Sequence, residues 1–389
     1  HMRPRVPPAA TPAPPLTGPA AARAWLDAQR ANLVAVATYT ADSGWPGHAT
    51  RLADTLYRYL SNGGHLSEAV TVYTCARRAA RQTSDHAAEA SALLGLGTLD
   101  IRLDRYGQAA QLLQQALDLF RQVGDPIGEA RALDNLAITH ALQGRYQQFV
   151  DLLEQSLPVY RKTGDLTGEA RVLGNLGWDE RLRGHYAEAA GHLQQALALF
   201  RRTGDTAGEA RTLAYLGDTK RRQGRYGEAG DHLRRALAMH RDAGDHVAVP
   251  LTFLGLLDLR QGRYTEATDH LSQALALHRE NADKAAEAET LNGLGDVFLA
   301  TGQHRQACTQ YTAALDLAGQ IGRKYEQARA HDGLGRAHHD LGDPVQARHH
   351  QQEALARYTE LGDPEADQVR ARLAGLGAEL SEPSDQLAE

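Results

Sequence analysis

The sequence predicts an all-α fold, an α-solenoid in which antiparallel helix pairs stack into a right-handed superhelix. The first observation is an internal repeat: a Gly-x-Tyr tripeptide recurs every 40 residues with one step of 38, and its register extends in both directions. The second is that apolar residues follow the helical period, whereas no segment alternates with the period of two of a strand. The register positions are Leu66, Tyr106, Tyr146, Tyr186, Tyr226, Tyr264, His304 and Pro344.

The first 45 residues differ from the repeats. His1-Met2 looks like a tag remnant, and residues 3–19 hold seven of the fourteen prolines, which predicts an extended linker over residues 1–19. The segment around Trp25 and Leu33 predicts one helix that caps the array, within residues 20–45. Residues 46–361 then hold about eight helix pairs, and residues 362–389 a final capping helix and a polar tail.

The sequence pattern of each repeat predicts two helices. The first carries Leu-Gly near its middle, as in Leu216-Gly217, and the second carries small and apolar residues at spacings of four and three, as in Ala229, Leu233 and Ala236. Such spacings place the three side chains on one helical face. Glycine and alanine at these positions let neighbouring helices pack closely.

Glycine and aspartate mark the boundaries between repeats. A glycine just past a helix end adopts the left-handed conformation that ends the helix, and the aspartate after it caps the next one. Pro126 fits the first turn, where its missing N–H costs nothing. The 38-residue step, with Pro250 near a helix start, is either a hinge or a tolerated deletion. The boundary pairs are Gly124-Asp125, Gly164-Asp165, Gly204-Asp205 and Gly244-Asp245.

These residues resemble the tetratricopeptide repeat (TPR). Its pattern is matched offset for offset by Leu216, Gly217, Tyr226, Ala229, Leu233 and Ala236. The repeat is longer than the usual 34 residues and lacks the usual proline after the second helix, which resembles the kinesin-light-chain and LGN type. The resemblance covers about four-fifths of the chain and implies a TPR superhelix with a concave groove.

A second resemblance concerns the segment around Trp25, followed by repeats rich in Gly-Glu-Ala-Arg. It resembles the junction after the NB-ARC ATPase module of SARP-type bacterial regulators. The resemblance implies the C-terminal regulatory region of a multidomain transcriptional regulator that controls secondary metabolism. The chain's own N-terminal modules would then be among its partners.

Composition and motifs exclude several classes of function. The net charge of −6 argues against direct nucleic-acid binding, and no apolar run is long enough to span a membrane. Two separated cysteines fit a reducing cytoplasm. No phosphate loop or hydrolase motif is present, so we expect no enzyme activity, cofactor or metal. Five histidines in the last repeat could bind Zn or Ni, but a solvated polar surface is the favoured interpretation: His331, His338, His339, His349 and His350.

The candidate binding residues lie on the first helices. Counting Leu-Gly as positions 7 and 8, positions 2, 6, 9 and 13 share one stripe, which lines the groove in TPR proteins, and position 12 adjoins it. Arginine pairs carboxylates bidentately, asparagine binds peptide backbone, and aromatic side chains anchor ligands. A similar ladder in LGN-like TPRs holds acidic, extended peptides, so we expect a protein or acidic peptide in this groove. The candidates are Arg131, Asn135, Arg171, Asn175, Trp178, Arg181, Arg211, Tyr215, Arg221, Arg222, Phe253 and Arg260.

Two sets of alternatives stay open. The arginines could instead pair with neighbouring repeats, for example with Glu129, Glu169 or Glu209. The chain could also be a stand-alone adaptor, or a groove that senses a small molecule. Self-association through the proline-rich arm would make it a homo-oligomer.

Overall fold

The computed structural model describes residues 17–243, 247–363 and 365–379, and all the regular elements among them are α-helices. The chain divides into two compact units, His1–Val172 and Leu173–Glu389. The helices are α1 (Pro19–Asp42), α2 (Pro46–Asn62), α3 (Leu66–Gln82), α4 (His86–Arg102), α5 (Tyr106–Val123), α6 (Pro126–Leu142), α7 (Tyr146–Thr163), α8 (Leu166–Leu182), α9 (Tyr186–Thr203), α10 (Thr206–Arg222), α11 (Tyr226–Ala243), α12 (Ala248–Arg260), α13 (Tyr264–Glu280), α14 (Lys284–Ala300), α15 (His304–Gln320), α16 (Lys324–Asp340), α17 (Pro344–Leu361) and α18 (Glu365–Glu379).

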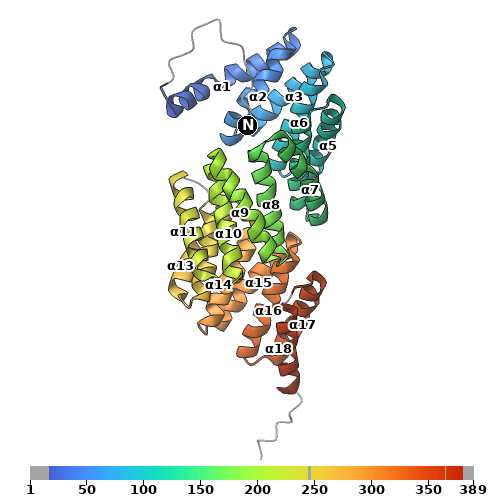
Figure 1. The fold of residues 1–389 in the computed structure, drawn as a ribbon. Coiled ribbons are helices and arrows are strands. Elements are labelled where there is room, and N and C mark those ends of the chain that lie inside the picture. The colour runs from blue at the N-terminus through green and yellow to red at the C-terminus, as the bar shows by residue number, and fades with distance from the viewer. Residues whose placement is uncertain (1–16, 244–246, 364, 380–389) are drawn as a thin grey trace, which may run out of the picture. The chain divides into compact units, whose positions relative to one another are not determined.

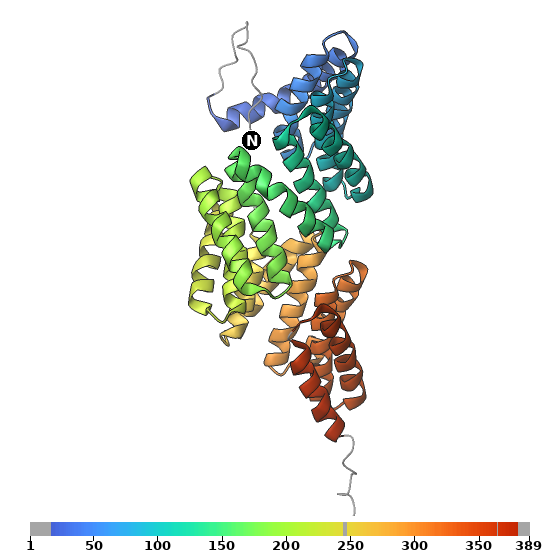
Figure 2. The same ribbon diagram turned by 45° about the vertical axis from the view of Figure 1, so that its right-hand side comes forward.

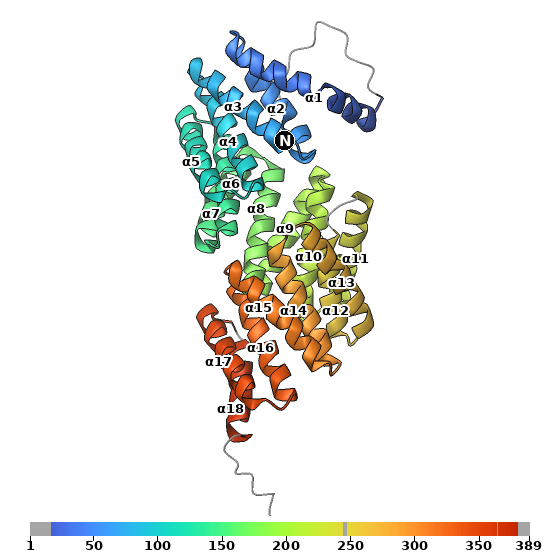
Figure 3. The same ribbon diagram turned by 180° about the vertical axis from the view of Figure 1, so that it is seen from behind.

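The predicted all-α repeat architecture is confirmed. All eight second helices begin at the register positions of the sequence, from Leu66 on α3 to Pro344 on α17. Successive helices pack against each other within each unit, as α4 on α5 and α10 on α11 do (Figure 1). Figures 2 and 3 show the same succession of helices from two further sides.

The boundaries follow the predicted chemistry. Gly124 and Gly204 end α5 and α9 with φ of 71° and 70°. The side chain of Asp205 then accepts a hydrogen bond from the backbone N–H of Gly208, at 2.9 Å, and Asp125 caps α6 in the same way. The Gly244-Asp245 boundary and the start of the 38-residue step lie outside the described residues.

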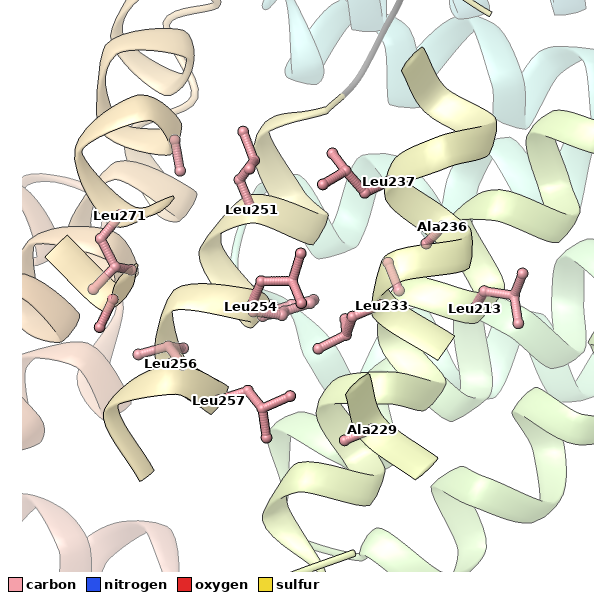
Figure 4. Close-up of a cluster of buried hydrophobic side chains, with 14 of the residues drawn as sticks. Leu213, Ala229, Leu233, Ala236, Leu237, Leu251, Leu254, Leu256, Leu257 and Leu271 are labelled. Atoms are coloured by element: carbon pink, nitrogen blue, oxygen red, sulfur yellow. The ribbon is translucent and has the colours of Figure 1, made fainter. Parts of the chain in front are cut away.

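The core is built from the predicted leucine and alanine positions. In unit 2 a cluster of buried side chains runs from α9 through α13 and beyond, and Figure 4 shows part of it between α10, α11, α12 and α13. Leu233 of α11 and Leu271 of α13 are fully buried there, each one helix along from a Leu-Gly pair. Leu113 and Leu153 take the same positions in unit 1.

Candidate functional site

The inner face of each unit is built by the first helices of the pairs. In unit 1, α2 contacts α4 and α4 contacts α6, while in unit 2 the chain of contacts runs from α10 through α12 and α14 to α16. Each first helix therefore lies between its own partner and its counterparts in the adjoining repeats. Side chains that leave this row on the free side line the two cavities described next.

The larger cavity belongs to unit 2 and has a volume of about 650 Å³. Six arginines face only three carboxylates around it, and three tyrosines complete its polar wall. Asp218 and Glu326, which do not line the cavity, also pair with Arg221 and Arg329, so one positive charge of the lining is left without a compensating carboxylate, although the whole chain is acidic. The charged and aromatic lining residues are Arg221, Arg222, Arg260, Arg329, Arg336, Arg372, Asp296, Asp332, Glu365, Tyr264, Tyr325 and Tyr358.

Three of these arginines are held by partners across the cavity. Arg222 donates to the hydroxyl of Tyr325 at 2.7 Å, although 103 residues separate the two in sequence. Arg329 binds Asp296 at 3.0 Å, and Arg372 binds Asp332 at 2.6 Å.

Arg260 and Arg336 differ from these three. Both side chains are exposed, and within the described part of the chain neither makes an ion pair or a hydrogen bond. They lie at positions 13 and 9 of their repeats, on the stripe that the sequence selects. The cavity therefore presents two uncommitted guanidinium groups beside four that are held by partners, since Arg221 binds Asp218.

A buried ion cluster lies at α8 and α10 of unit 2. Asp218 is fully buried and accepts from Arg181 at 2.5 Å and from Arg221 at 2.6 Å. Burial acts to raise the pKa of Asp218, but the guanidinium groups of Arg221, Arg181 and Arg222 hold it well below its usual value. The carboxylate is therefore charged and neutralises two arginines that are almost completely buried.

Two aromatic candidates pack on this cluster. The guanidinium carbon of Arg181 lies 5.6 Å from the ring centroid of Tyr215 and 5.3 Å from that of Phe253. Phe253 is only 2% exposed and belongs to the core, and Tyr215 packs against that core. Position 6 of the repeat thus points into the protein at Tyr215 and Phe253. At Gly293 and Gly333, which hold the same position in the next two repeats, an added Cβ would meet Leu256 and Tyr311 instead.

The smaller cavity belongs to unit 1 and has a volume of about 410 Å³. Arg131, Asn135 and Arg171 line it as expected, but with them lie Asp54, Asp134 and Asp165. Arg171 is an ion-pair partner of Asp134, whose side chain is 1% exposed, and it also donates to the hydroxyl of Tyr160 at 3.0 Å. The carboxylates outnumber the arginines, so this cavity is the less favourable of the two for an acidic peptide.

The remaining candidates are more scattered. Asn175 is half-buried, and Trp178 is half-buried with the guanidinium carbon of Arg323 5.9 Å from its ring centroid. Arg211 is exposed and lines neither cavity.

The glutamates named as alternative partners pair elsewhere. Glu129, Glu169 and Glu209 each accept from an arginine eight residues earlier, at 2.8 to 2.9 Å. That arginine lies in the last turn of the preceding helix and the glutamate in the first turn of the next. The spacing Arg-x7-Glu is visible in the sequence and was the missed signal. The arginines are Arg121, Arg161 and Arg201.

The unit 2 cavity also contains residues that are not among the candidates chosen from the sequence. Asp296, Arg329 and Arg336 occupy positions 9, 2 and 9 of their repeats, so the stripe that gives Arg260 also gives them. Tyr325 and Arg372 lie outside the stripe, at the start of α16 and on α18, and no repeat position indicates them.

The histidines of the last repeat form a partly buried ring cluster. His331 and His350 lie with their Nδ1 atoms 3.0 Å apart, and His338 stacks on His350 at a centroid distance of 5.5 Å. Among the described residues no group of three His, Cys, Asp or Glu side chains is arranged to hold a metal ion. The expected solvated surface is therefore only half right, because His331 is 7% exposed.

Acid should destabilise unit 2 through these two rings. Burial lowers the pKa values of His331 and His350 to about 4, with a further lowering from Arg357 at His331 and from neighbouring histidines at both. In the unfolded chain the two imidazole rings bind protons near pH 6.5. Above that pH they do not reduce the free energy of unfolding, and as the pH falls toward 4 they lower it by up to about 1.4 kcal/mol per pH unit for each ring. Urea midpoints at pH 7.5 and 5 should differ less in His331→Gln/His350→Gln than in the exposed control His86→Gln. An equal pH dependence in both variants would contradict this assignment.

Over the described ranges, none of the helices has the length and apolarity needed to cross a bilayer.

No curated protein sequence matches this chain. Solved structures do. A Rap protein complexed with Competence and Sporulation Factor is 13% identical with a TM-score of 0.57, covering 86% of this chain and 98% of that one. The apo form of RapI is 16% identical with a TM-score of 0.56, covering 69% and 96%.

A third similar structure is a Signal Transduction ATPase with Numerous Domains (STAND) protein with a tetratricopeptide repeat sensor from Pyrococcus horikoshii. It is 13% identical with a TM-score of 0.54, and the match covers 86% of this chain but half of that protein. At these identities the three structures show a shared fold. The tetratricopeptide repeat family model matches residues 63–122, 128–202, 189–242, 208–280, 246–320 and 286–360. The matches cover most of the chain, which therefore belongs to the tetratricopeptide repeat family.

Proposed function

We propose that this chain is a protein-interaction and sensor module whose unit 2 cavity binds an acidic, extended segment of a partner protein. The observation that carries the proposal is the charge of that cavity, with six arginines against three carboxylates and two arginines without a partner in the described residues. Guanidinium groups bind carboxylates bidentately, so Arg260 and Arg336 supply the contacts that a ligand completes.

The rest of the cavity wall suits a peptide. Arg222 and Arg329 are held by Tyr325 and Asp296, so little side-chain entropy is lost when they meet a ligand. Tyr264, which is exposed, adds amphipathic surface that can pack on aliphatic parts of a chain and hydrogen-bond its backbone. Arg131 and Asn135 of unit 1 are a second, weaker candidate contact.

The proposal also concerns the regulatory context in which the chain acts. The segment around Trp25 resembles the junction after an NB-ARC module, and the STAND protein with a similar fold is described as having a TPR sensor. We place this chain in the cytoplasm, as the regulatory region of a transcriptional regulator of secondary metabolism. The array would bias the ATPase only if it bound its ligand differently in the two states of that module.

The test is a titration of the whole chain with two fluorescein-labelled peptides, (Glu-Gly)6 and (Lys-Gly)6, followed by fluorescence anisotropy. We expect the acidic peptide alone to bind, and Arg260→Glu/Arg336→Glu to weaken it at least about tenfold, or about 1.4 kcal/mol. The matched control is Arg202→Glu/Arg305→Glu, which makes the same change of charge at exposed positions of unit 2 outside the cavity.

Each outcome has a meaning. Equal loss in both double variants would show a general charge effect and contradict the site. Binding of neither peptide, together with binding of a small anion that the cavity variant loses, would favour the small-molecule sensor. Arg171→Glu is a poor test of the groove, because it would set a carboxylate against buried Asp134 and damage unit 1.

A further inference from the structure

The first helix of unit 1 presents an outer stripe without charge, which the exposed Arg23 and Asp27 flank and Asp42 follows. The inner side of α1 packs on α2 and α3, with Leu26, Leu33 and Val34 against the core of that end. Its exposed outer side forms two adjacent rows, and Figure 3 shows α1 as the first element of the row of helices in unit 1. The outer residues are Ala24, Trp25, Ala28, Ala31, Asn32, Ala35, Val36 and Tyr39.

Such a face is unusual at the end of a repeat array, where a terminal helix normally presents polar side chains to water. Trp25, Val36 and Tyr39 are 37%, 47% and 67% exposed and lie on one side of the helix. Exposed apolar residues that gather on one face, rather than scatter singly, mark an interaction surface.

The spacing of these residues makes the face complementary to itself. Asn32 lies seven residues after Trp25 and seven before Tyr39, so a twofold axis through Asn32 sets Trp25 against the Tyr39 of a second, antiparallel copy. The same axis places Ala28 against Val36. This exchange of equivalent contacts is what a twofold interface requires.

The chemistry of the face favours the same arrangement. The eight side chains carry no charge, and the exposed Arg23, Asp27 and Asp42 would stay at the rim of the contact in water, so two copies meet without burying an unpaired charge. Two Asn32 amides on the axis satisfy each other, since each carries a donor and an acceptor, and such a central asparagine fixes the register.

We propose that the chain forms a twofold-symmetric dimer through α1, with Asn32 on the axis. The contact runs about 21 Å from Trp25 to Tyr39 at 1.5 Å per residue. One helix pair buries less than the roughly 1,200–2,000 Å² of a standard stable interface, so we expect a weak dimer whose population depends on concentration.

Sedimentation velocity of the whole chain from 5 to 200 µM tests the proposal. We expect the dimer fraction to rise with concentration, and Trp25→Glu/Tyr39→Glu to stay monomeric with an unchanged circular dichroism spectrum. The matched control is Val345→Glu/Leu361→Glu, which replaces exposed apolar residues of unit 2 and should dimerise as the parent does. A parent that is monomeric at 200 µM, or a Trp25/Tyr39 variant that still dimerises, overturns the proposal.

Cross-linking tests the axis itself. Asn32→Cys should form an intermolecular disulfide joining position 32 to position 32 under mild oxidation, identified by mass spectrometry of the linked peptides. Arg23→Cys, exposed on the same helix but off the face, should not. A dimer in which only the Arg23→Cys variant cross-links would place the interface elsewhere.

Discussion

Replacing Asp218 by asparagine is expected to lower the free energy of unfolding of unit 2 by about 3–5 kcal/mol. Asp218 is fully buried and is the ion-pair partner of both Arg181 and Arg221, whose side chains are 4% and 6% exposed. The asparagine side chain would keep the size but not the charge, and would leave two guanidinium groups buried without a counterion. The loss reflects these orphaned charges, not the net worth of the ion pair.

Asp231→Asn is the control for this result. Asp231 also binds an arginine, Arg234, at 2.7 Å on α11, but its side chain is 79% exposed. Exposed pairs contribute about 0–1 kcal/mol, so this variant should unfold almost as the parent does. Urea unfolding followed by circular dichroism gives the energies, and hydrogen exchange of α10 peptides assigns the loss to unit 2. Equal shifts in the two variants would contradict the assignment.

The helix pairs could be predicted because their signals are local. Gly204 and Asp205 end one helix and start the next through contacts a few residues long, and Tyr226 starts α11 as its register predicts. The depth of each inner side chain could not be predicted in this way. Phe253 and Arg260 belong to the same stripe of one helix, yet Phe253 is in the core and Arg260 is exposed.

The missing information is the curvature of the array. Arg222 meets Tyr325 because the row of first helices within unit 2 curves and brings α10 near α16. A period of 40 residues predicts which side chains face inward. It does not predict which of them contact each other when they lie more than two repeats apart. Gly-x-Tyr and Leu-Gly therefore predict the fold, while the partners of the arginines depend on geometry that accumulates along the chain.

The second large effect concerns the Leu-Gly pair, where alanine should destabilise even though it is the better helix former. A Cβ atom at Gly217 would lie 2.6 Å from Cγ of Leu233 and 3.2 Å from the backbone oxygen of Ala229. Leu233 is fully buried, so it has no free space into which to move. The same close approach recurs between Gly177 and Leu193, and between Gly255 and Leu271.

Gly191→Ala is the control, and we expect it to raise the stability of the protein rather than lower it. Gly191 is inside α9, and an added Cβ would meet nothing within 4 Å. Alanine there should stabilise by up to about 1 kcal/mol through helix propensity alone. Gly217→Ala gains the same propensity but overpacks the crossing at a cost of about 1–3 kcal/mol, so we expect a net loss of up to about 2 kcal/mol. Thermal and urea unfolding of the two variants test this prediction. If both variants are more stable than the parent, the helix crossing tolerates a side chain. The Leu-Gly repeat would then reflect common ancestry of the units rather than packing.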